Sequence, residues 1–206
     1  MDNNTRQRLL ALTHNMIMRY GISSVTMDII AKECKVSKRT LYEAFTDKAS
    51  LVKEVLDWHR QSMKNKLAEI SNNSTNTLET LLKSIAVVRE SMNNISEVFF
   101  TEVSTKYSPA REECDRIESQ IIEGLAVYFA KGQSEGIFLS HYDSTYLARV
   151  FIYSTLNFRL AYEKVGNISN TLDYLDVMRE CFIRGIVTQK GLEIYNEFYN
   201  NDNKNY

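Results

Sequence analysis

The stretch of residues 37–51, SKRTLYEAFTDKASL, constrains the fold of this chain more than any other. Ser37 places a side-chain oxygen ahead of a helical run, where it can accept hydrogen bonds from the first backbone N–H groups of the helix. Leu41 and Phe45 stand four residues apart and form an apolar stripe that favours burial. We therefore expect a short amphipathic helix, followed at once by the start of another. Its outward-facing side chains include Lys38, Arg39 and Tyr42.

Another short helix precedes this one. Thr26 can cap a helix from Met27 to Cys34, and Asp28 in its first turn is favoured by the positive end of the helix dipole. Two short helices joined by a tight turn are typical of the helix-turn-helix motif, which we place over residues 27–45. The N-terminal half of the second helix of such a motif can enter the major groove of DNA, where Arg or Lys binds guanine and hydroxyl groups reach phosphates or base edges.

Two longer helices flank the motif. Residues 5–20 have the apolar spacing of an amphipathic helix, and Gly21 follows as its C-cap. Asp47 is a suitable N-cap for a fourth helix, which ends at the Asn/Ser/Thr-rich break of residues 71–77. Lys48 lies in the first turn of this helix, where a cation is unfavourable to the dipole. A nearby phosphate explains its presence better than helix stability does.

These features together resemble the N-terminal domain of regulators of the tetracycline-repressor (TetR) family, over roughly the first quarter of the chain. The matching residues in this sequence are Gly21, Thr26, Ile30-Ala31, Val36-Ser37, Leu41-Tyr42, Phe45 and Lys48 with Leu51. The resemblance implies that Thr26, Tyr42 and Lys48 hold phosphates and that residues 37–40 face the groove. The candidate DNA contacts are therefore Thr26, Ser37, Lys38, Arg39, Thr40, Tyr42 and Lys48.

Two positions depart from the pattern common in that family, which often has glycine where this chain has Lys35 and Arg39. A left-handed backbone at Lys35 would cost on the order of 1 kcal/mol relative to glycine. Arg39, if it faces DNA, adds a base-reading group that many relatives lack. The operator preference of relatives is therefore not transferred to this chain.

The remainder of the chain is predicted to be helical, because it has helical apolar spacing, no alternating strand pattern and only one proline. Five further helices are expected near residues 78–94, 96–106, 109–136, 143–164 and 171–189. The predicted fold is all-α with about nine helices: an N-terminal three-helix domain with a helix-turn-helix, and a C-terminal helical domain for ligand binding and dimerisation.

The predicted domains are residues 1–47 for DNA binding and residues 48–199 for effector binding and dimerisation, with helix 48–70 as the connector. Residues 200–206 are expected to be a frayed tail. In relatives the last two long helices pair with those of a second subunit, which implies a homodimer. A dimer also suits the function, since one short recognition helix contacts too few bases to select a site. The candidate interface residues are Leu147, Phe151, Leu175 and Phe182.

An effector would bind in the larger domain, where aromatic residues are numerous enough to line a mostly apolar pocket. Any one of them is more often a core or interface residue, so the prediction concerns the set. The set, with its polar members, is Phe99, Phe100, Tyr107, Tyr128, His141, Asn157, Phe158, Arg159 and Tyr162.

The composition narrows the possible functions. Residues 1–64 hold 11 Lys and Arg against 7 Asp and Glu, whereas the rest holds 14 against 19, so the small basic excess lies in the helix-turn-helix half. Three well-separated cysteines indicate neither a zinc site nor a disulfide framework, and no metal or cofactor is expected. Cys34 is expected to fill a core site, with a redox-sensing thiol as the alternative. With no signal segment or apolar run of bilayer length, we expect a cytoplasmic protein without membrane contact.

The sequence therefore predicts a ligand-responsive transcriptional regulator that binds a palindromic double-stranded DNA operator as a dimer. We expect a repressor, released by an unidentified small and mostly apolar effector. The alternatives are a helical interaction or dimerisation module and an activator without a small-molecule effector. An enzyme is not expected, because no nucleophile with a base, catalytic carboxylate pair or glycine-rich phosphate loop occurs at suitable spacing.

Overall fold

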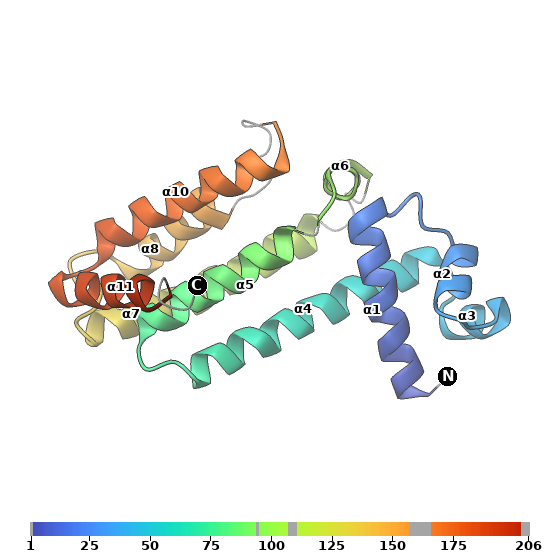
Figure 1. The fold of residues 1–206 in the computed structure, drawn as a ribbon, viewed down its shortest axis with the longest axis horizontal. Helices are drawn as coiled ribbons and strands as arrows, with labels where there is room; N and C mark the ends of the chain where they lie inside the picture. Colours follow the sequence, from blue (N-terminus) through green and yellow to red (C-terminus); the bar gives the residue numbers. More distant parts are fainter. Residues whose placement is uncertain (1, 94, 107–110, 157–165, 203–206) are drawn as a thin grey trace. The chain divides into compact units, whose positions relative to one another are not determined.

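The computed structural model describes residues 2–93, 95–106, 111–156 and 166–202. Within these ranges the chain forms ten α-helices and one π-helical segment, with no strand beyond an isolated bridge between Phe138 and Val187 (Figure 1). The predicted all-α fold is therefore confirmed. None of the helices in the described part of the chain combines the length and the apolar character that crossing a bilayer requires.

The chain divides into two compact units. The first contains Met1–Ala68 and Asn94–Ser108, and the second contains Glu69–Asn93 and Pro109–Tyr206. This division differs from the boundary at residue 47 suggested by the sequence, because the first part of the fourth helix and a later helix pack with the N-terminal ones. The functional assignment of the domains stays a prediction.

The first unit is built from four helices and most of a fifth: α1 (Asn3–Tyr20), α2 (Met27–Glu33), α3 (Lys38–Ala44), α6 (Glu97–Lys106) and α4 (Lys48–Asn72) as far as its residue 68. Their starts follow from local hydrogen bonds. Thr26 and Ser37 cap α2 and α3 as expected, and Asp47 accepts from the backbone N–H of Ser50 at 2.7 Å. Helix α1 begins two residues earlier than expected, because Asp2 supplies its N-cap.

The core of this unit collects the apolar faces of its helices. Leu41 and Phe45 of α3 are buried, as their spacing predicted, and they pack with Leu9 of α1, Ile30 of α2 and Leu51 of α4. The same core takes in residues of α6, which lies far along the sequence. Burial of these stripes against one another stabilises helices that are too short to persist alone in water.

A buried carboxylate joins α6 to the loop that follows α1. Glu102 is only 6% exposed and accepts hydrogen bonds from the backbone N–H groups of Ile22 at 2.5 Å and Ser23 at 3.1 Å. Gly21 has a φ of 83°, and a Cβ there would lie 2.6 Å from the side chain of Val98. Glycine is therefore needed at this position both for the backbone conformation and for the close approach of α6.

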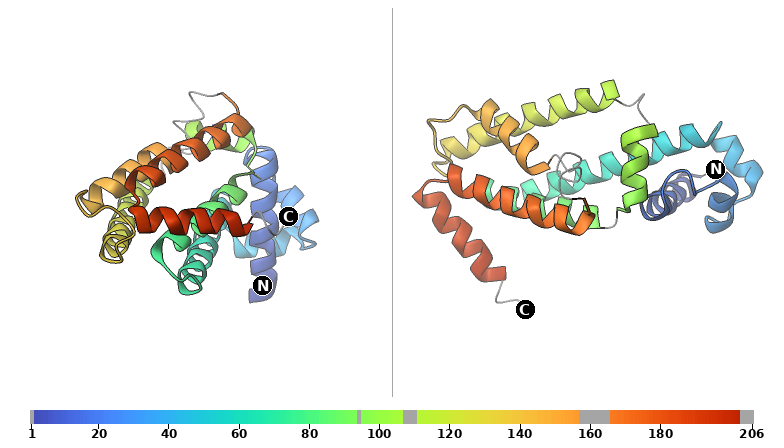
Figure 2. Two further views of the ribbon diagram at one scale, coloured as in Figure 1. Left: turned by 60° about the vertical axis from the view of Figure 1, so that its left-hand side comes forward. Right: turned by 90° about the horizontal axis from the view of Figure 1, so that it is seen from above.

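The second unit contains the end of α4 and the helices α5 (Thr77–Asn93), α7 (Arg111–Ser134), α8 (Ser144–Phe151), α10 (Ile168–Ile186) and α11 (Gln189–Asp202). The π-helical segment η2 (Ile152–Leu156) continues α8 directly. Helix α8 packs against α7, whereas η2 packs against α10, and α5 contacts α7, α10 and α11. Both views in Figure 2 show α11 leaving the end of α10 at a sharp angle.

Aromatic side chains fill the centre of this unit. The ring of Phe129 lies 5.5 Å from that of Phe138 and 6.0 Å from those of Phe151 and Phe182, measured between centroids. Phe138 belongs to the α7–α8 connection, which is tied to the α10–α11 turn by the hydrogen bond from the Leu139 N–H to the Ile186 carbonyl at 2.8 Å. The core of the second unit thus depends on segments that are distant in sequence.

The structure changes one predicted helix and part of the predicted tail. The regular α-helix expected over residues 143–164 ends at Phe151 and passes into the π-helical segment, and residues 157–165 lie outside the described part. The expected frayed tail is wrong for residues 200–202, which belong to α11. The sequence held a signal for α11: Thr188 accepts at its start from the Gly191 N–H, and Leu192 and Tyr195 follow at helical spacing.

Candidate functional site

The outward face of α3 carries the residues predicted to read DNA. The side chain of Arg39 is 89% exposed and pairs with Glu43 one turn later, with its Nε 2.8 Å from the carboxylate. Lys38 is 63% exposed and pairs with Asp28 of α2 at 2.7 Å, and Tyr42 is also exposed. Exposed ion pairs of this kind contribute little to stability, so these cations can exchange their partners for phosphates or bases at small cost.

Three of the candidate hydroxyl groups serve as caps or support them. The Thr26 hydroxyl accepts from the Ile29 N–H at 3.2 Å, and the Ser37 hydroxyl accepts from the Thr40 N–H at 3.0 Å. The Ser37 and Thr40 hydroxyl oxygens are themselves 2.7 Å apart. These groups fix the N-termini of α2 and α3, as expected from the sequence, and each hydroxyl keeps capacity for a further hydrogen bond.

Lys48 lies at the start of α4, beside the α1–α2 loop. Its ammonium group donates to the carbonyl of Ser23 at 3.4 Å. Partial burial lowers the pKa of Lys48, and the nearby Glu102 carboxylate opposes this shift. The lysine is therefore held by the loop rather than extended into solvent, which favours a defined contact over a diffuse charge.

The turn between α2 and α3 is tight and strained at one residue. Lys35 has a φ of 54° and is the only non-glycine residue with positive φ in the described part of the chain. The left-handed backbone considered for this position from the sequence is therefore confirmed. The preceding Cys34 is fully buried in the core, and burial raises the pKa of its thiol. A raised pKa disfavours the thiolate that redox sensing requires.

The predicted effector residues that the structure describes belong to different units. Phe99 is buried in the core of the first unit, because its stripe on α6 packs there. Tyr128 belongs to the second unit, where its hydroxyl donates to the Thr77 carbonyl, and His141 is exposed. The remaining candidates lie outside the residues whose placement or side chains are described: Phe100 (side chain only), Tyr107, Asn157, Phe158, Arg159 and Tyr162.

The predicted dimer residues are mostly inside the second unit. Leu147 and Phe151 are buried and Phe182 is half-buried in the aromatic core, and Leu175 of α10 is also buried. A different row on the same elements is exposed. It comprises Tyr146, Val150 and Tyr153 on α8 and η2, with Tyr174, Val177 and Cys181 on α10.

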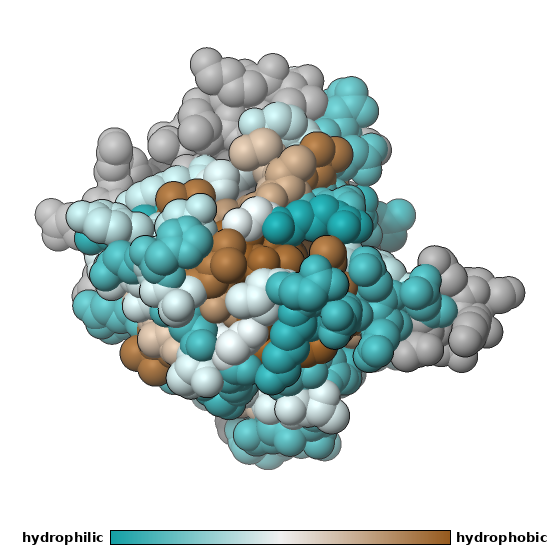
Figure 3. Space-filling view, turned by 90° about the vertical axis from the view of Figure 1, so that its left-hand side faces the viewer, coloured by the Kyte–Doolittle hydropathy of each residue, from teal (hydrophilic) through white to brown (hydrophobic). Residues whose placement is uncertain are grey.

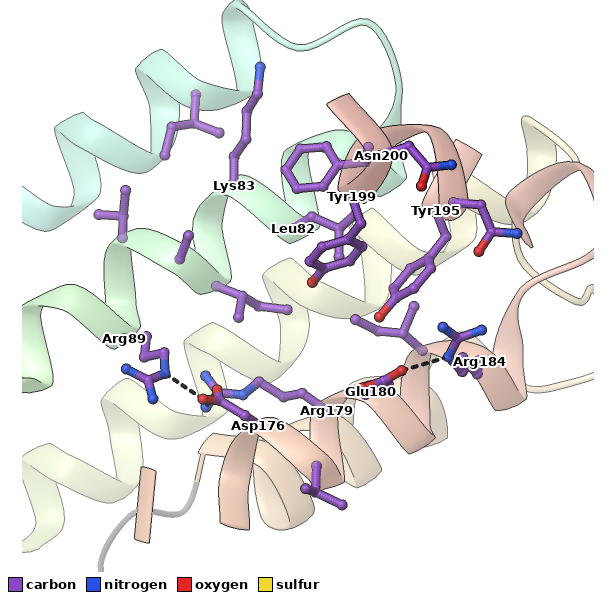
Figure 4. Close-up of a pocket in the computed structure, with 18 residues that line it drawn as sticks. Leu82, Lys83, Arg89, Asp176, Arg179, Glu180, Arg184, Tyr195, Tyr199 and Asn200 are labelled. Carbon is purple, nitrogen blue, oxygen red and sulfur yellow. Dashed lines mark hydrogen bonds and ion pairs between the residues drawn. The ribbon is translucent and has the colours of Figure 1, made fainter. Parts of the chain in front are cut away.

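Two clefts lie among the described residues of the second unit. The larger, about 1090 Å³, lies between α5, α10 and α11 and is lined by charged, tyrosine and aliphatic side chains (Figure 4). The smaller, about 630 Å³, borders the exposed row of α8 and α10 and includes His141 and Tyr146. Figure 3 shows the end of the second unit that carries the α10–α11 turn, where hydrophobic side chains gather in the centre and hydrophilic ones surround them.

The residues that line the larger cleft, such as Arg89, Arg179 and Tyr199, were not predicted from the sequence as binding-site residues. One signal was available, because Arg179 follows Leu175 by four residues and so lies on the inward stripe of α10, where a cation is unexpected. No group of three or more potential metal ligands occurs among the residues that the structure describes.

Comparison with known proteins agrees with this geometry. The family described as bacterial regulatory proteins of the tetR family matches residues 9–55. An uncharacterized HTH-type transcriptional regulator of Mycobacterium bovis is 27% identical over 135 residues, which cover 64% of this chain and 68% of that protein. A DNA-binding transcriptional repressor, TetR, of Mycobacteroides abscessus is 30% identical over 73 residues, or 35% of this chain and 38% of that protein.

An uncharacterized HTH-type transcriptional regulator of Bacillus subtilis is 33% identical over 51 residues, which cover 25% of this chain and only 26% of that protein. The fold similarity extends much further than the sequence similarity. The crystal structure of a transcriptional regulator from Cytophaga hutchinsonii covers 87% of this chain and 97% of its own with a TM-score of 0.73, at 18% identity. The helix-turn-helix of the first unit, the family match and the common fold agree with one another. Residues 9–55 match the tetR family of bacterial regulatory proteins, and the chain is similar in sequence to HTH-type transcriptional regulators and in fold to a solved one.

Proposed function

We propose that this protein is a homodimeric repressor that binds a palindromic operator and is released by a small, mostly apolar effector. The observation that carries the proposal is the outward face of α3, where Lys38, Arg39 and Tyr42 are exposed while Leu41 and Phe45 anchor the helix in the core. A rigid helix with a buried back and a cationic front is suited to insertion into the major groove.

Each candidate contact has a proposed role. Lys38 and Arg39 reach base edges, with Arg39 the stronger candidate for bidentate contact with guanine. Tyr42 and Lys48 bind phosphates and set the position of α3, together with the hydroxyls of Thr26, Ser37 and Thr40. The short reach of one helix makes a second subunit necessary, with the two α3 helices about 34 to 36 Å apart on successive turns of DNA.

Operator binding is tested first by selection of genomic fragments in an electrophoretic shift assay, followed by footprinting beside the protein's own gene. We expect a palindromic protected site. Reporter expression from the selected promoter then separates a repressor from an activator. If no fragment is enriched over the bulk DNA, the operator proposal is wrong, and a helical interaction module becomes the better reading.

The second subunit is proposed to cover the exposed row of α8 and α10. Tyr146 is 70% exposed and Val150 51%, and both line one cleft with Cys181 of α10; exposed apolar side chains gathered on one surface are typical of a protein interface. A row that faces away from the protomer's own core can pack against its copy in a four-helix arrangement. This row replaces the buried residues suggested by the sequence as the proposed contact surface.

The interface is tested with Val150→Glu, which places a charge in the proposed contact without disturbing the core. Light scattering is expected to give a folded monomer that binds operator poorly. Val127→Glu is the matched control, because Val127 of α7 is 73% exposed outside this row. A dimer of unchanged stability in Val150→Glu would place the interface elsewhere.

An effector can release the protein from its operator only if it binds more tightly to the conformation that does not bind DNA. The chain crosses between the two units near residues 68, 93 and 108, so α4, α5, α6 and α7 are all connected to a crossing. A ligand that alters the second unit can therefore change the α4 and α6 segments that belong to the first. About 1.4 kcal/mol of preference for the released state is needed for each tenfold loss of operator affinity.

A further inference from the structure

The larger cleft differs from the aromatic pocket expected from the sequence. It lies between α5, α10 and α11, and all of its lining residues belong to the second unit. Its volume, about 1090 Å³, is slightly above the range of roughly 300 to 1,000 Å³ that is usual for small-molecule sites. Figure 4 shows Tyr195 and Tyr199 projecting from α11 toward α10, and Arg89 projecting from α5 toward Asp176.

One part of the cleft is apolar. Leu82 and Ile85 of α5 face it from one side, Ile183 of α10 from another and Phe198 of α11 from a third. Leu82 and Ile183 are buried in the core of the unit, so this wall is fixed by the packing behind it. An alkyl or aryl group placed here would remove apolar surface from water without a rearrangement of the fold.

The other part is cationic and partly buried. Arg179 is only 4% exposed, and it donates to the Leu175 carbonyl at 3.0 Å and to the Asp176 carboxylate at 2.5 Å. Burial lowers the pKa of Arg179, which reflects the cost of keeping its charge away from water. Arg89 donates to the same Asp176 carboxylate and, at 3.3 Å, to Asp173, whose side chain is 70% exposed.

Cations outnumber anions among the side chains that line the cleft, while Glu79 and Asp173, which pair with Lys83 and Arg89, lie outside the lining. Four cations face two anions: Lys83, Arg89, Arg179 and Arg184 against Asp176 and Glu180. Two guanidinium groups thus share the one carboxylate that lines this end of the cleft. An incoming anion would reduce their mutual repulsion and would accept from guanidinium N–H groups in the planar geometry that suits a carboxylate.

The tyrosines of α11 add hydrogen-bond donors. Tyr195 is 5% exposed, and burial raises the pKa of its hydroxyl, which therefore stays protonated. Its ring lies 4.8 Å from that of Tyr199, between centroids, and the guanidinium of Arg184 lies 4.7 Å above the Tyr195 ring. The α11 side of the cleft thus presents hydroxyl groups and aromatic faces close to the cationic end.

We infer that this cleft binds a small amphipathic carboxylate, with its carboxylate at Arg89 and Arg179 and its apolar body against Leu82, Ile85 and Phe198. A purely apolar effector would make no contact with the guanidinium groups of the arginine pair, and a cationic one would be repelled by them. The inference makes the effector class of the proposed function more specific, and it rests on that function only for the regulatory consequence.

The consequence for regulation comes from α10, which borders both surfaces. Asp176, Arg179 and Ile183 face the cleft, and Tyr174 and Cys181 lie on the exposed row proposed to meet the second subunit. Val177 belongs to both surfaces. A ligand that draws α5, α10 and α11 together would shift the inner side of a helix whose outer side sets the subunit contact. Ligand binding can therefore alter the spacing of the two recognition helices.

The test is isothermal titration of the full-length protein with decanoate, decan-1-ol and decylamine, which share a tail and differ in the charge of the head group. Decanoate is expected to bind at least about tenfold more tightly than the alcohol, and the amine not at all. Arg89→Gln should weaken decanoate by at least about tenfold. Lys131→Gln, which removes a 67% exposed cation of the same unit outside the cleft, should leave it unchanged.

Two results would overturn the inference: equal affinity for decanoate and decan-1-ol, or decanoate binding that Arg89→Gln leaves intact. Arg89 is chosen for the substitution because its side chain is 33% exposed, so Arg89→Gln is expected to fold, whereas Arg179 is buried. An operator shift assay with and without decanoate separates the two proposals. Operator binding without decanoate binding refutes the cleft alone, whereas decanoate binding without any operator refutes the repressor alone.

Discussion

Arg39 and Lys48 are proposed to contact different parts of DNA, and their substitution should have different effects. Arg39→Ala is expected to relax base preference at one symmetric pair of positions and to cost about 1 to 3 kcal/mol per contact. Lys48→Ala should weaken binding to every sequence alike, because a phosphate carries no sequence information. The measurement is operator affinity on a panel of single-base variants, repeated at several salt concentrations.

The salt dependence gives the sharper distinction. Loss of one phosphate contact per subunit should make the plot of log K against log salt shallower for Lys48→Ala. Lys64→Ala is the matched control, since Lys64 lies on the same helix 16 residues further on, about 24 Å along the axis at 1.5 Å per residue. A slope that is the same for all three proteins would remove Lys48 from the interface.

His14 of α1 and His59 of α4 form a stacked pair, with ring centroids 4.4 Å apart, next to Trp58. Burial lowers the pKa of both, that of His59 to about 4, and the second histidine and Lys66 add to the effect on His59. The Nε2 of His14 is buried without a hydrogen-bond partner among the described residues, which also disfavours the imidazolium. Both rings are therefore neutral in the fold at neutral pH.

The pH dependence follows from this neutrality. An unfolded histidine takes up a proton near pH 6.5, whereas His59 resists it down to about pH 4, so the unfolded chain binds more protons between these values. Stability should fall as the pH is lowered from about 6.5 toward 4. Fluorescence of Trp58, the one tryptophan of the chain, can follow urea unfolding across this range. His59→Phe should flatten the dependence and His141→Gln should not; equal slopes in wild type and His59→Phe would contradict this account.

At the scale of single helices, α7 offers two glycines in different surroundings. A Cβ on Gly132 would lie 2.3 and 2.4 Å from ring atoms of Phe138, which is 1% exposed, whereas a Cβ on Gly124 would meet nothing within 4 Å. Gly124→Ala should stabilise the protein by about 0.5 to 1 kcal/mol through helix propensity alone. Gly132→Ala should destabilise it, because overpacking of about 1 to 3 kcal/mol exceeds that gain.

Urea titration followed by circular dichroism measures both variants, each serving as the control for the other. Opposite shifts of the transition are expected. If both variants shifted the transition in the same direction, the Phe138 ring would be able to move aside without loss of stability. The α7–α8 connection would then be only loosely packed.

Helix starts could be predicted from the sequence because each depends on a few adjacent residues. Thr26, Ser37 and Asp47 cap helices where expected, and Gly21 ends α1 with positive φ. The end of α8 was not predictable in this way. Its apolar pattern continues past Phe151, yet the hydrogen bonding changes to a π-helical segment that packs on α10. Tertiary packing, not local preference, decides such a transition.

At the scale of the whole molecule, substitutions at two adjacent residues of α8 should have different effects on folding. Phe151 is 2% exposed, and its ring lies 5.4 Å from that of Phe182, whereas Val150 is 51% exposed. Phe151→Glu would bury a carboxylate in an aromatic core and should unfold the second unit, while Val150→Glu should leave it folded. Circular dichroism with light scattering distinguishes the two. A stable, DNA-competent dimer with Phe151→Glu would mean that α8 is placed wrongly.

The sequence alone determined the all-α fold, the helix-turn-helix and the residues on the outward face of α3. All of these follow from side-chain periodicity and capping, which act over one or two helical turns. It also indicated the departure at Lys35, whose φ of 54° is set by the local turn.

Only the tertiary structure decided which aromatic residues are core, which row of α8 and α10 is exposed, and where a ligand could bind. The sequence assigned Phe99 and Tyr128 to one pocket, but they pack in different units. It could not join Arg89 to Asp176, which lie 87 positions apart and meet because α5 packs against α10. Helical periodicity shows which side of a helix is apolar, whereas the partner of that side is chosen by long-range packing.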